Sequence, residues 1–204
     1  MKSTLLFNAL LVASMTANAE TRGFDGDAVG QPPAGWTCGA TGRGSPRWTV
    51  EMDPGSTSQS KVLKQGGYGT FPWCVKNDTA LTDGMVEVRF KPISGKEDQA
   101  GGVVWRWKNG DNYYVARANA LENNVALYYT IDGSRHTIAS KDAPVATNTW
   151  HTLRVSYKGE VMEVALDGKT YITEKDRHIT GGGKTGVWTK ADSVTIFEGF
   201  DFHQ

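Results

Sequence analysis

The segment from Gly101 to Ala139 constrains the fold more than any other part of the chain. It contains four short runs in which aromatic or aliphatic residues alternate with polar ones, and turn sequences join these runs. Asn109-Gly110 and Asp132-Gly133 are typical turns, because Asn, Asp and Gly tolerate the positive backbone angles of tight hairpins. Alternation with a period of two indicates strands that have one buried and one wet face. The segment therefore predicts an antiparallel β-sheet.

The same alternation occurs elsewhere in the chain, most clearly in Met85–Phe90, Trp150–Tyr157 and Val161–Leu166. Turn signals recur about every 8–12 residues, which is typical of sandwiches and barrels. No segment keeps the apolar spacing of three and four that an amphipathic helix needs. We therefore expect an all-β jelly-roll sandwich of two antiparallel sheets. The Gly- and Pro-rich segment Glu20–Ser60 is expected to form long loops around it.

The first nineteen residues have the pattern of a secretory signal peptide. Lys2 gives a positive start, Leu5–Ala13 is mostly apolar, and Ala17-Asn18-Ala19 resembles a cleavage site. The apolar run is too short to span a bilayer, and no later segment is longer. We expect residues 1–19 to be removed and residues 20–204 to form one domain. This domain would be exported, periplasmic or extracellular, and without a membrane span.

The charge balance excludes one large class of partners. Without Lys2 the chain has 21 basic and 22 acidic side chains, so its net charge is near −1. No basic stripe is present, whereas nucleic-acid binding relies on neutralising the phosphate backbone. We expect no nucleic-acid partner. The sequence does not indicate an oligomeric state.

Cys38 and Cys74 are the only cysteines of the chain. Export would place them in an oxidising compartment, which favours a disulfide between them. Neither has a second Cys or a His at metal-ligand spacing, so a zinc site is disfavoured. We expect one disulfide that pins the N-terminal segment to the sandwich.

Several motifs occur in an order that resembles a known group of bacterial exported domains. They are Phe24-Asp25-Gly26-Asp27, Pro33-Ala34-Gly35-Trp36, Gly101–Arg106, Asn112-Tyr113-Tyr114, Trp150–Val155, Leu166-Asp167-Gly168 and Gly186–Ser193. The group comprises the 3-keto-disaccharide hydrolase-like and laminin-G-like domains of the concanavalin A-like lectin/glucanase superfamily. The resemblance covers nearly all of residues 20–204. It implies a two-sheet jelly roll with a concave face and, in many relatives, a carbohydrate ligand.

Aromatic, amide and arginine side chains gather around the predicted hairpin at Asn109-Gly110. If its two strands pair, Arg106 and Arg117 would lie on neighbouring strands and on one face. Forked arginine hydrogen bonds and ring stacking would suit an acidic or polyhydroxylated ligand. The other interpretation is a solvated face whose arginine stems cover apolar neighbours. Our candidate ligand contacts are Arg106, Trp107, Asn112, Tyr113 and Arg117, whereas Trp105 is expected in the core.

The carboxylates give weaker signals. Retaining glucanases of this fold carry a Glu-x-Asp-x-x-Glu strand, in which two carboxylates work as nucleophile and acid. Glu51-Met52-Asp53 matches only its first part, and Pro54 would end the strand. Asp25-Gly26-Asp27 resembles part of a calcium loop, which Asp192 and Asp201 would complete, although a plain turn explains it equally. We expect no organic cofactor, and we retain calcium as an open alternative.

Three functional hypotheses remain. The first is an exported carbohydrate-binding, lectin-like domain that uses the concave sheet. The second is a glycan-degrading hydrolase of the 3-keto-disaccharide hydrolase type, as the resemblance implies. The third is a structural envelope domain without a small ligand. A hydrolase would show an inward Asp or Glu with a partner acid or a bound metal on the concave face, whereas a binding domain needs only rings and amides there.

Overall fold

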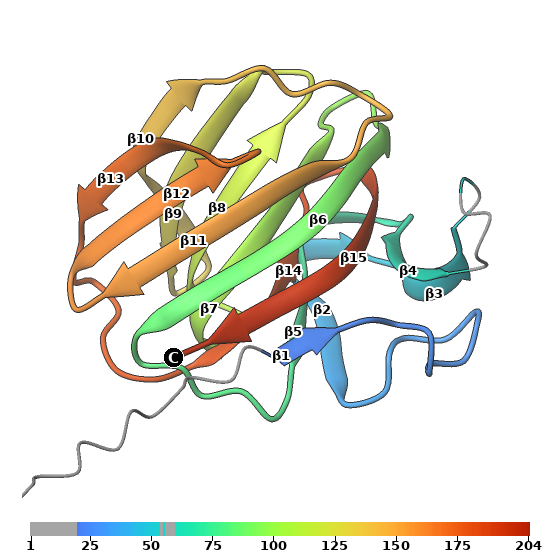
Figure 1. Ribbon diagram of the computed structural model, residues 1–204, viewed down its shortest axis with the longest axis horizontal. Helices are drawn as coiled ribbons and strands as arrows, with labels where there is room; N and C mark the ends of the chain where they lie inside the picture. Colours follow the sequence, from blue (N-terminus) through green and yellow to red (C-terminus); the bar gives the residue numbers. More distant parts are fainter. Residues whose placement is uncertain (1–19, 54, 56–59) are drawn as a thin grey trace, which may run out of the picture.

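The structure, a computed structural model, describes residues 20–53, 55 and 60–204, and the predicted signal peptide lies outside this range. The described residues form strands joined by turns and loops and contain no α-helix. Figure 1 shows two layers, in which β11, β6 and β15 lie in front of β8 and β7. The strands are β1 (Glu20–Arg22), β2 (Trp36–Ser45), β3 (Trp48–Met52), β4 (Lys61–Gln65), β5 (Tyr68–Lys76), β6 (Gly84–Ser94), β7 (Ala100–Asn109), β8 (Asn112–Asn119), β9 (Asn124–Ile131), β10 (Ser134–Asp142), β11 (His151–Lys158), β12 (Val161–Leu166), β13 (Lys169–Lys175), β14 (Lys184–Trp188) and β15 (Val194–His203).

The strands form two antiparallel sheets, as the sequence predicts. Sheet A has the order β13-β12-β11-β6-β15-β4-β3, and β1 pairs with β15 as its eighth strand. Sheet B has the order β10-β9-β8-β7-β14-β5-β2. Neighbours in these orders are often distant in sequence, which is the crossed connectivity of a jelly roll. The prediction of an all-β jelly-roll sandwich of two antiparallel sheets is confirmed.

The main apolar core lies between the two sheets. In β11 the residues His151, Leu153, Val155 and Tyr157 are buried, while the residues between them are more exposed. Trp105 of β7 is fully buried in this core, where its ring stacks on Tyr157 with centroids 5.8 Å apart. The period-two pattern therefore identified the buried face correctly, and the core position of Trp105 is confirmed.

Two hairpin turns adopt the geometry that the Asp-Gly sequences predict. The φ angles are 49° at Asp132 and 76° at Gly133, and they are 50° at Asp167 and 80° at Gly168. Two successive positive φ angles characterise a type I′ turn, whose twist matches that of the flanking strands. These turns fix the registers of β9 with β10 and of β12 with β13.

The N-terminal segment differs from its prediction as long loops, because it contains the ten-residue strand β2. β2 pairs with β5 at the edge of sheet B, and Cys38 lies opposite Cys74 in this pair. The disulfide between these two cysteines is confirmed. Glycine disfavours strands when nothing fills the space of its missing side chain. Here the Trp73 ring covers Gly39, since a Cβ at that residue would lie 2.8 Å from the ring.

Sheet B is strongly curved, so that its outer face is concave. β10 and β5 are five places apart in the strand order, which corresponds to about 24 Å across a flat sheet. Yet the guanidinium carbon of Arg135, on β10, lies 4.5 Å from the centre of the Phe71 ring, on β5. At the other edge, the hydroxyl oxygens of Thr41, on β2, and Tyr113, on β8, are 2.7 Å apart. The two edges of the sheet therefore bend toward each other over its outer face.

Candidate functional site

The outer face of sheet B carries a second aromatic cluster, which is separate from the core between the sheets. Its buried members come only from strands of sheet B, and they include Trp73, Tyr113, Tyr128 and Trp188. Phe71 and Trp107 are partly buried against them. An outer sheet face that faced only water would carry polar residues. The strand sequences instead direct aromatic rings to both sides of sheet B, which marks the outer face as a candidate binding surface.

Arg117 of β8 lies within this face and is held by three side chains. One terminal nitrogen donates to Asn124 Oδ1 at 2.5 Å. The other donates to Glu122 Oε2 at 2.6 Å and to the Tyr128 hydroxyl at 3.0 Å. Only 3% of the side chain is exposed, and its Nε atom has no hydrogen-bond acceptor. These contacts fix the plane of the guanidinium and occupy both of its terminal nitrogens.

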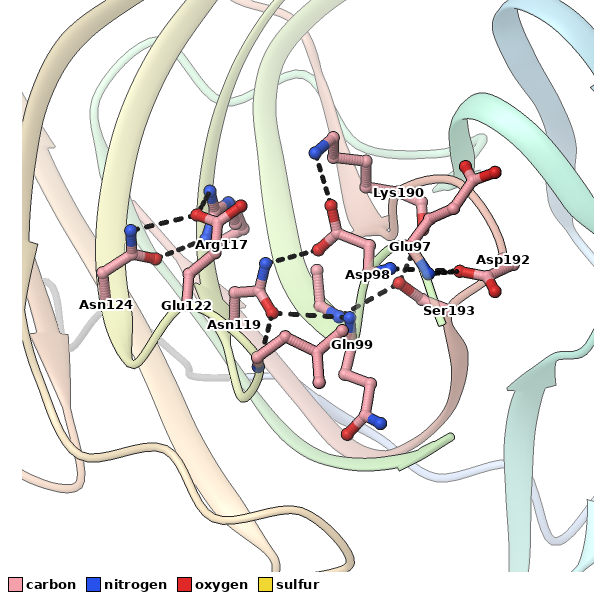
Figure 2. A network of polar contacts seen from close by, with 12 residues as sticks. Glu97, Asp98, Gln99, Arg117, Asn119, Glu122, Asn124, Lys190, Asp192 and Ser193 are labelled. Atoms are coloured by element: carbon pink, nitrogen blue, oxygen red, sulfur yellow. Dashed lines mark hydrogen bonds and ion pairs between the residues drawn. The ribbon is translucent and has the colours of Figure 1, made fainter. Parts of the chain in front are cut away.

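A buried carboxylate lies next to Arg117 on the same face. Asp98 has no exposed side-chain area and forms an ion pair with Lys190, at 2.5 Å between Oδ2 and Nζ. Its other oxygen accepts a hydrogen bond from Asn119 Nδ2 at 2.5 Å. Figure 2 shows Asp98, Asn119 and Lys190 beside the Arg117–Glu122 pair. We call these five residues the charged network. Lys190 remains 28% exposed, so the network reaches the surface.

Burial and ion pairing shift the pKa values of the two carboxylates in opposite directions. Burial raises the pKa of Asp98, although the ammonium of Lys190 and the charge of Arg117 oppose this shift. Burial also acts to raise the pKa of Glu122, but its hydrogen bond and charge interaction with Arg117 outweigh burial and lower that pKa. Both carboxyl groups are occupied by cations of the protein, which is typical of a structural and orienting role.

Hydrogen bonds between backbone amides and Asp192 hold the charged network in position. The carboxylate of Asp192 accepts hydrogen bonds from the backbone N–H groups of Lys96, Glu97 and Asp98, at 2.6, 3.0 and 3.1 Å. Burial acts to raise the pKa of Asp192, but these three amides outweigh it and lower the pKa. Ser193 donates to the carbonyl oxygen of Lys190. The two partners Asp98 and Lys190 are thus each fixed by the loop that joins β14 to β15.

The structure places four of the five predicted ligand contacts on or beside the outer face. Tyr113 is fully buried there, and its hydroxyl lies against Thr41 rather than toward solvent. Trp107 packs edge-on against Trp73, with ring centroids 5.2 Å apart. Asn112 lies in the turn region, where it donates to Asn109 and accepts from the amide of Asp132. Arg117, discussed above, is the fourth.

Arg106 does not join them, so the expectation that Arg106 and Arg117 share a face is wrong. The pairing of β7 with β8 shifts register after Trp105, and Arg106 has a φ of 46°. This irregularity breaks the alternation and turns the side chain toward sheet A. There its guanidinium lies 5.4 Å from the centre of the Tyr157 ring and donates to the backbone carbonyls of Thr82, Gly159 and Ile179.

Sequence reasoning missed three residues of the face, namely Asp98, Arg135 and Lys190. The ion pair of Asp98 with Lys190 joins segments that are far apart in sequence, so no local spacing indicates it. The sequence does contain a signal for Arg135. Arg135 pairs with Thr130, and Thr130 lies two residues from Tyr128 on the same strand, so all three side chains lie on the same face of sheet B. The curvature that brings it over Phe71 has no local sequence signature.

The carboxylates considered for calcium and for glucanase chemistry lie elsewhere. The Lys61 ammonium donates to the backbone carbonyls of Asp25 and Asp27, at 2.9 and 2.7 Å. No group of three or more candidate metal ligands gathers within the described part of the chain. Calcium binding stays a prediction. Glu51 lies on sheet A, where it pairs with Lys64.

Two hollows lie at the end of the sandwich near Arg106. One, of about 430 Å³, is lined by Asp83, Tyr157 and Gln204 among others. The other, of about 230 Å³, borders Arg106, Glu160 and residues of the loop before β14. Because three protein carbonyls and the Asp83 carboxylate already accept from Arg106, its guanidinium is less available to a ligand than the Nη1 atom of Arg135, which has no acceptor.

Comparison with solved structures identifies the fold. The carbohydrate-binding module CBM66 from Bacillus subtilis aligns with a TM-score of 0.68 and 20% identity, over 83% of this chain and 96% of that chain. The β-glucanase of Bacillus licheniformis aligns with a TM-score of 0.61 and 12% identity, over 94% and 99%. The exoplasmic/lumenal domain of VIP36 in a Ca²⁺- and mannose-bound form aligns with a TM-score of 0.54 and 15% identity, over 90% and 88%.

Comparison of the sequence itself with known protein families and with curated proteins gave no match. At these identities the structural similarities establish the jelly-roll fold, and a fold by itself hosts many functions. Within the described residues, no helix is long and apolar enough to cross a membrane.

Proposed function

We propose that this chain is an exported carbohydrate-binding protein and that its ligand lies on the outer, concave face of sheet B. The observation that carries the proposal is the guanidinium of Arg135 over the rings of Phe71, Tyr128 and Trp188, with Arg117 beside the Tyr128 ring. Rings offer stacking surfaces for the apolar faces of sugars, and arginine forks offer donors to their oxygen atoms. Two guanidinium nitrogens, Nε of Arg117 and Nη1 of Arg135, lack hydrogen-bond acceptors.

The structural neighbours support the same class of ligand. One is a carbohydrate-binding module, another carries mannose, and a third is a glucanase. The disulfide between Cys38 and Cys74 agrees with an exported protein, because disulfides persist in oxidising compartments. The predicted signal peptide at residues 1–19 belongs to the same proposal.

Hydrolysis of a glycosidic bond, as in the 3-keto-disaccharide hydrolase-like group, is the second candidate. Asp98 and Glu122 lie on the same face, and their pKa values are shifted in opposite directions. Hydrolases use such separation to obtain one acid and one base. Because each carboxylate forms an ion pair with a cation of the protein, binding without cleavage has the stronger support. Product analysis after incubation with bound glycans would reveal cleavage.

Substitution of Arg117 tests the proposal on a glycan array. We expect wild type to bind at least one class of glycan. Arg117→Gln should bind it about tenfold more weakly or worse, because three hydrogen bonds from Arg117 hold Glu122, Asn124 and Tyr128 in place on this face. The matched control is Arg89→Gln, which changes an exposed arginine on sheet A that pairs with Glu198. It should leave the signal unchanged. Absence of signal from every folded protein would instead favour a structural domain without a small ligand.

A further inference from the structure

Arg135 occupies an unusual position for a residue of an edge strand. It extends from β10 over the middle of the outer face, where its guanidinium carbon lies 4.3 Å from the centre of the Tyr128 ring. It also lies 4.5 Å from the Phe71 ring and 5.6 Å from the Trp188 ring. These rings belong to three different strands, β9, β5 and β14. The side chain is therefore held where a ligand on this face would meet it.

Arg135 forms no direct ion pair within the described residues, although Asp98 is near enough to attract its charge. Arg117 pairs with Glu122, and Lys190 pairs with Asp98. In the part of the chain that the structure describes, no carboxylate forms an ion pair with Arg135, and its buried Nη1 atom has no acceptor. Aromatic rings attract a cation through their quadrupoles, but they do not neutralise it. Among these groups, the three cations Arg117, Arg135 and Lys190 lie beside two carboxylates, Asp98 and Glu122.

The groups around Arg135 act on its charge in both directions. Burial lowers the pKa of Arg135 and the charge of Arg117 adds to this shift, because the two guanidinium groups repel each other, whereas Tyr128 and the carboxylate of Asp98 partly oppose it. Arginine nevertheless stays protonated, so the repulsion is not relieved by loss of a proton. An anion bound beside both groups would relieve it.

We propose that the glycan bound on this face is acidic and that Arg135 pairs with its anionic group. This inference rests on the proposed function and adds the ligand class. Neutral hydroxyl groups accept hydrogen bonds, whereas a carboxylate or sulfate also supplies the missing negative charge. A planar carboxylate matches the two parallel donors of a guanidinium, which makes uronate sugars the favoured class.

Calorimetric titration with matched probes tests this inference. The probes are oligomers of galacturonate, mannuronate and glucuronate, each before and after chemical reduction of its carboxylates to alcohols. A sulfated galactan oligomer and its desulfated form make the second arm. Wild type should bind at least one acidic probe tenfold or more tightly than its neutral partner, and added salt should weaken only the acidic complex. The two arms distinguish uronate from sulfate recognition.

Variants of Arg135 separate recognition from packing. Arg135→Met keeps an apolar stem over the rings and should abolish the preference for the acidic probe. Arg135→Lys should keep part of it, and Arg89→Met, on the opposite sheet, should keep all of it. Thermal unfolding of each variant confirms folding.

Equal binding of acidic and neutral probes by wild type would overturn this inference while leaving the proposed function intact. A full acidic preference in Arg135→Met, whatever its melting temperature, would overturn it too and assign Arg135 a packing role. Failure of wild type to bind any glycan would overturn the proposed function and, with it, this inference.

Discussion

Replacement of Arg106 by methionine will lower the free energy of unfolding by about 3–5 kcal/mol, because it removes the buried guanidinium that donates to several acceptors at once. The guanidinium donates to the carbonyl oxygens of Thr82, Ile179 and Gly159, at 3.1, 3.2 and 2.7 Å. It also contacts the carboxylate of Asp83 at 3.3 Å. These acceptors come from three separate loops, so the Arg106 side chain links the three loops to one another at this end of the sandwich. Methionine leaves all of them without this donor.

Thermal and urea denaturation measure this effect. The melting temperature should fall by about 10 °C for a domain of this length. The matched control is Arg89→Met, which removes an exposed ion pair and should change the free energy by less than about 1 kcal/mol. Per folded molecule, Arg106→Met should bind glycans as wild type does, since Arg106 faces sheet A. A decrease of less than about 1 kcal/mol in the free energy of unfolding of Arg106→Met would contradict the structural role that we assign to Arg106.

Removal of the disulfide is expected to have an effect of similar size. The bond links Cys38 and Cys74, which are 36 residues apart. Closing a loop of that length lowers the entropy of the unfolded chain and stabilises the fold by about 3–4 kcal/mol. Cys74 is also fully buried in the core, so Cys38→Ala/Cys74→Ala avoids placing a serine hydroxyl there. The double variant should therefore unfold at clearly lower urea concentration than oxidised wild type.

A reductant provides the control for this prediction. Reduced wild type should approach the stability of the double variant, whereas the double variant should not respond to reductant. Coincident unfolding curves for oxidised wild type and the double variant would show that β2 is held by its pairing with β5 alone.

Much of the fold follows from local sequence. Alternating strands and Asp-Gly turns predicted the two sheets, because burial of one strand face and positive φ angles both leave marks on single residues. The core position of Trp105 followed from the tendency of such rings to fill a sandwich core, and the disulfide followed from the presence of only two cysteines and the expected export. β2 did not, because its glycines hide the alternation and the Trp73 ring that covers Gly39 comes from another strand.

The candidate site was harder to predict, since it depends on geometry that no short segment encodes. The backbone irregularity at Arg106 reversed the direction of one predicted contact. The curvature of sheet B brought Arg135 of β10 over Phe71 of β5. Asp98 and Lys190 meet through two loops that are distant in sequence. Arg117 alone was predicted as a ligand contact and is placed within the charged network.

Chemical-shift mapping of backbone amides during titration with an array-selected glycan tests most directly whether the outer face of sheet B holds the ligand. We predict that the largest saturable shifts occur at Arg117, Tyr128 and Arg135, while the outer residues of sheet A stay unchanged. Shifts that instead cluster around the hollows beside Arg106, at Asp83 and Glu160, would contradict the placement of the ligand on this face.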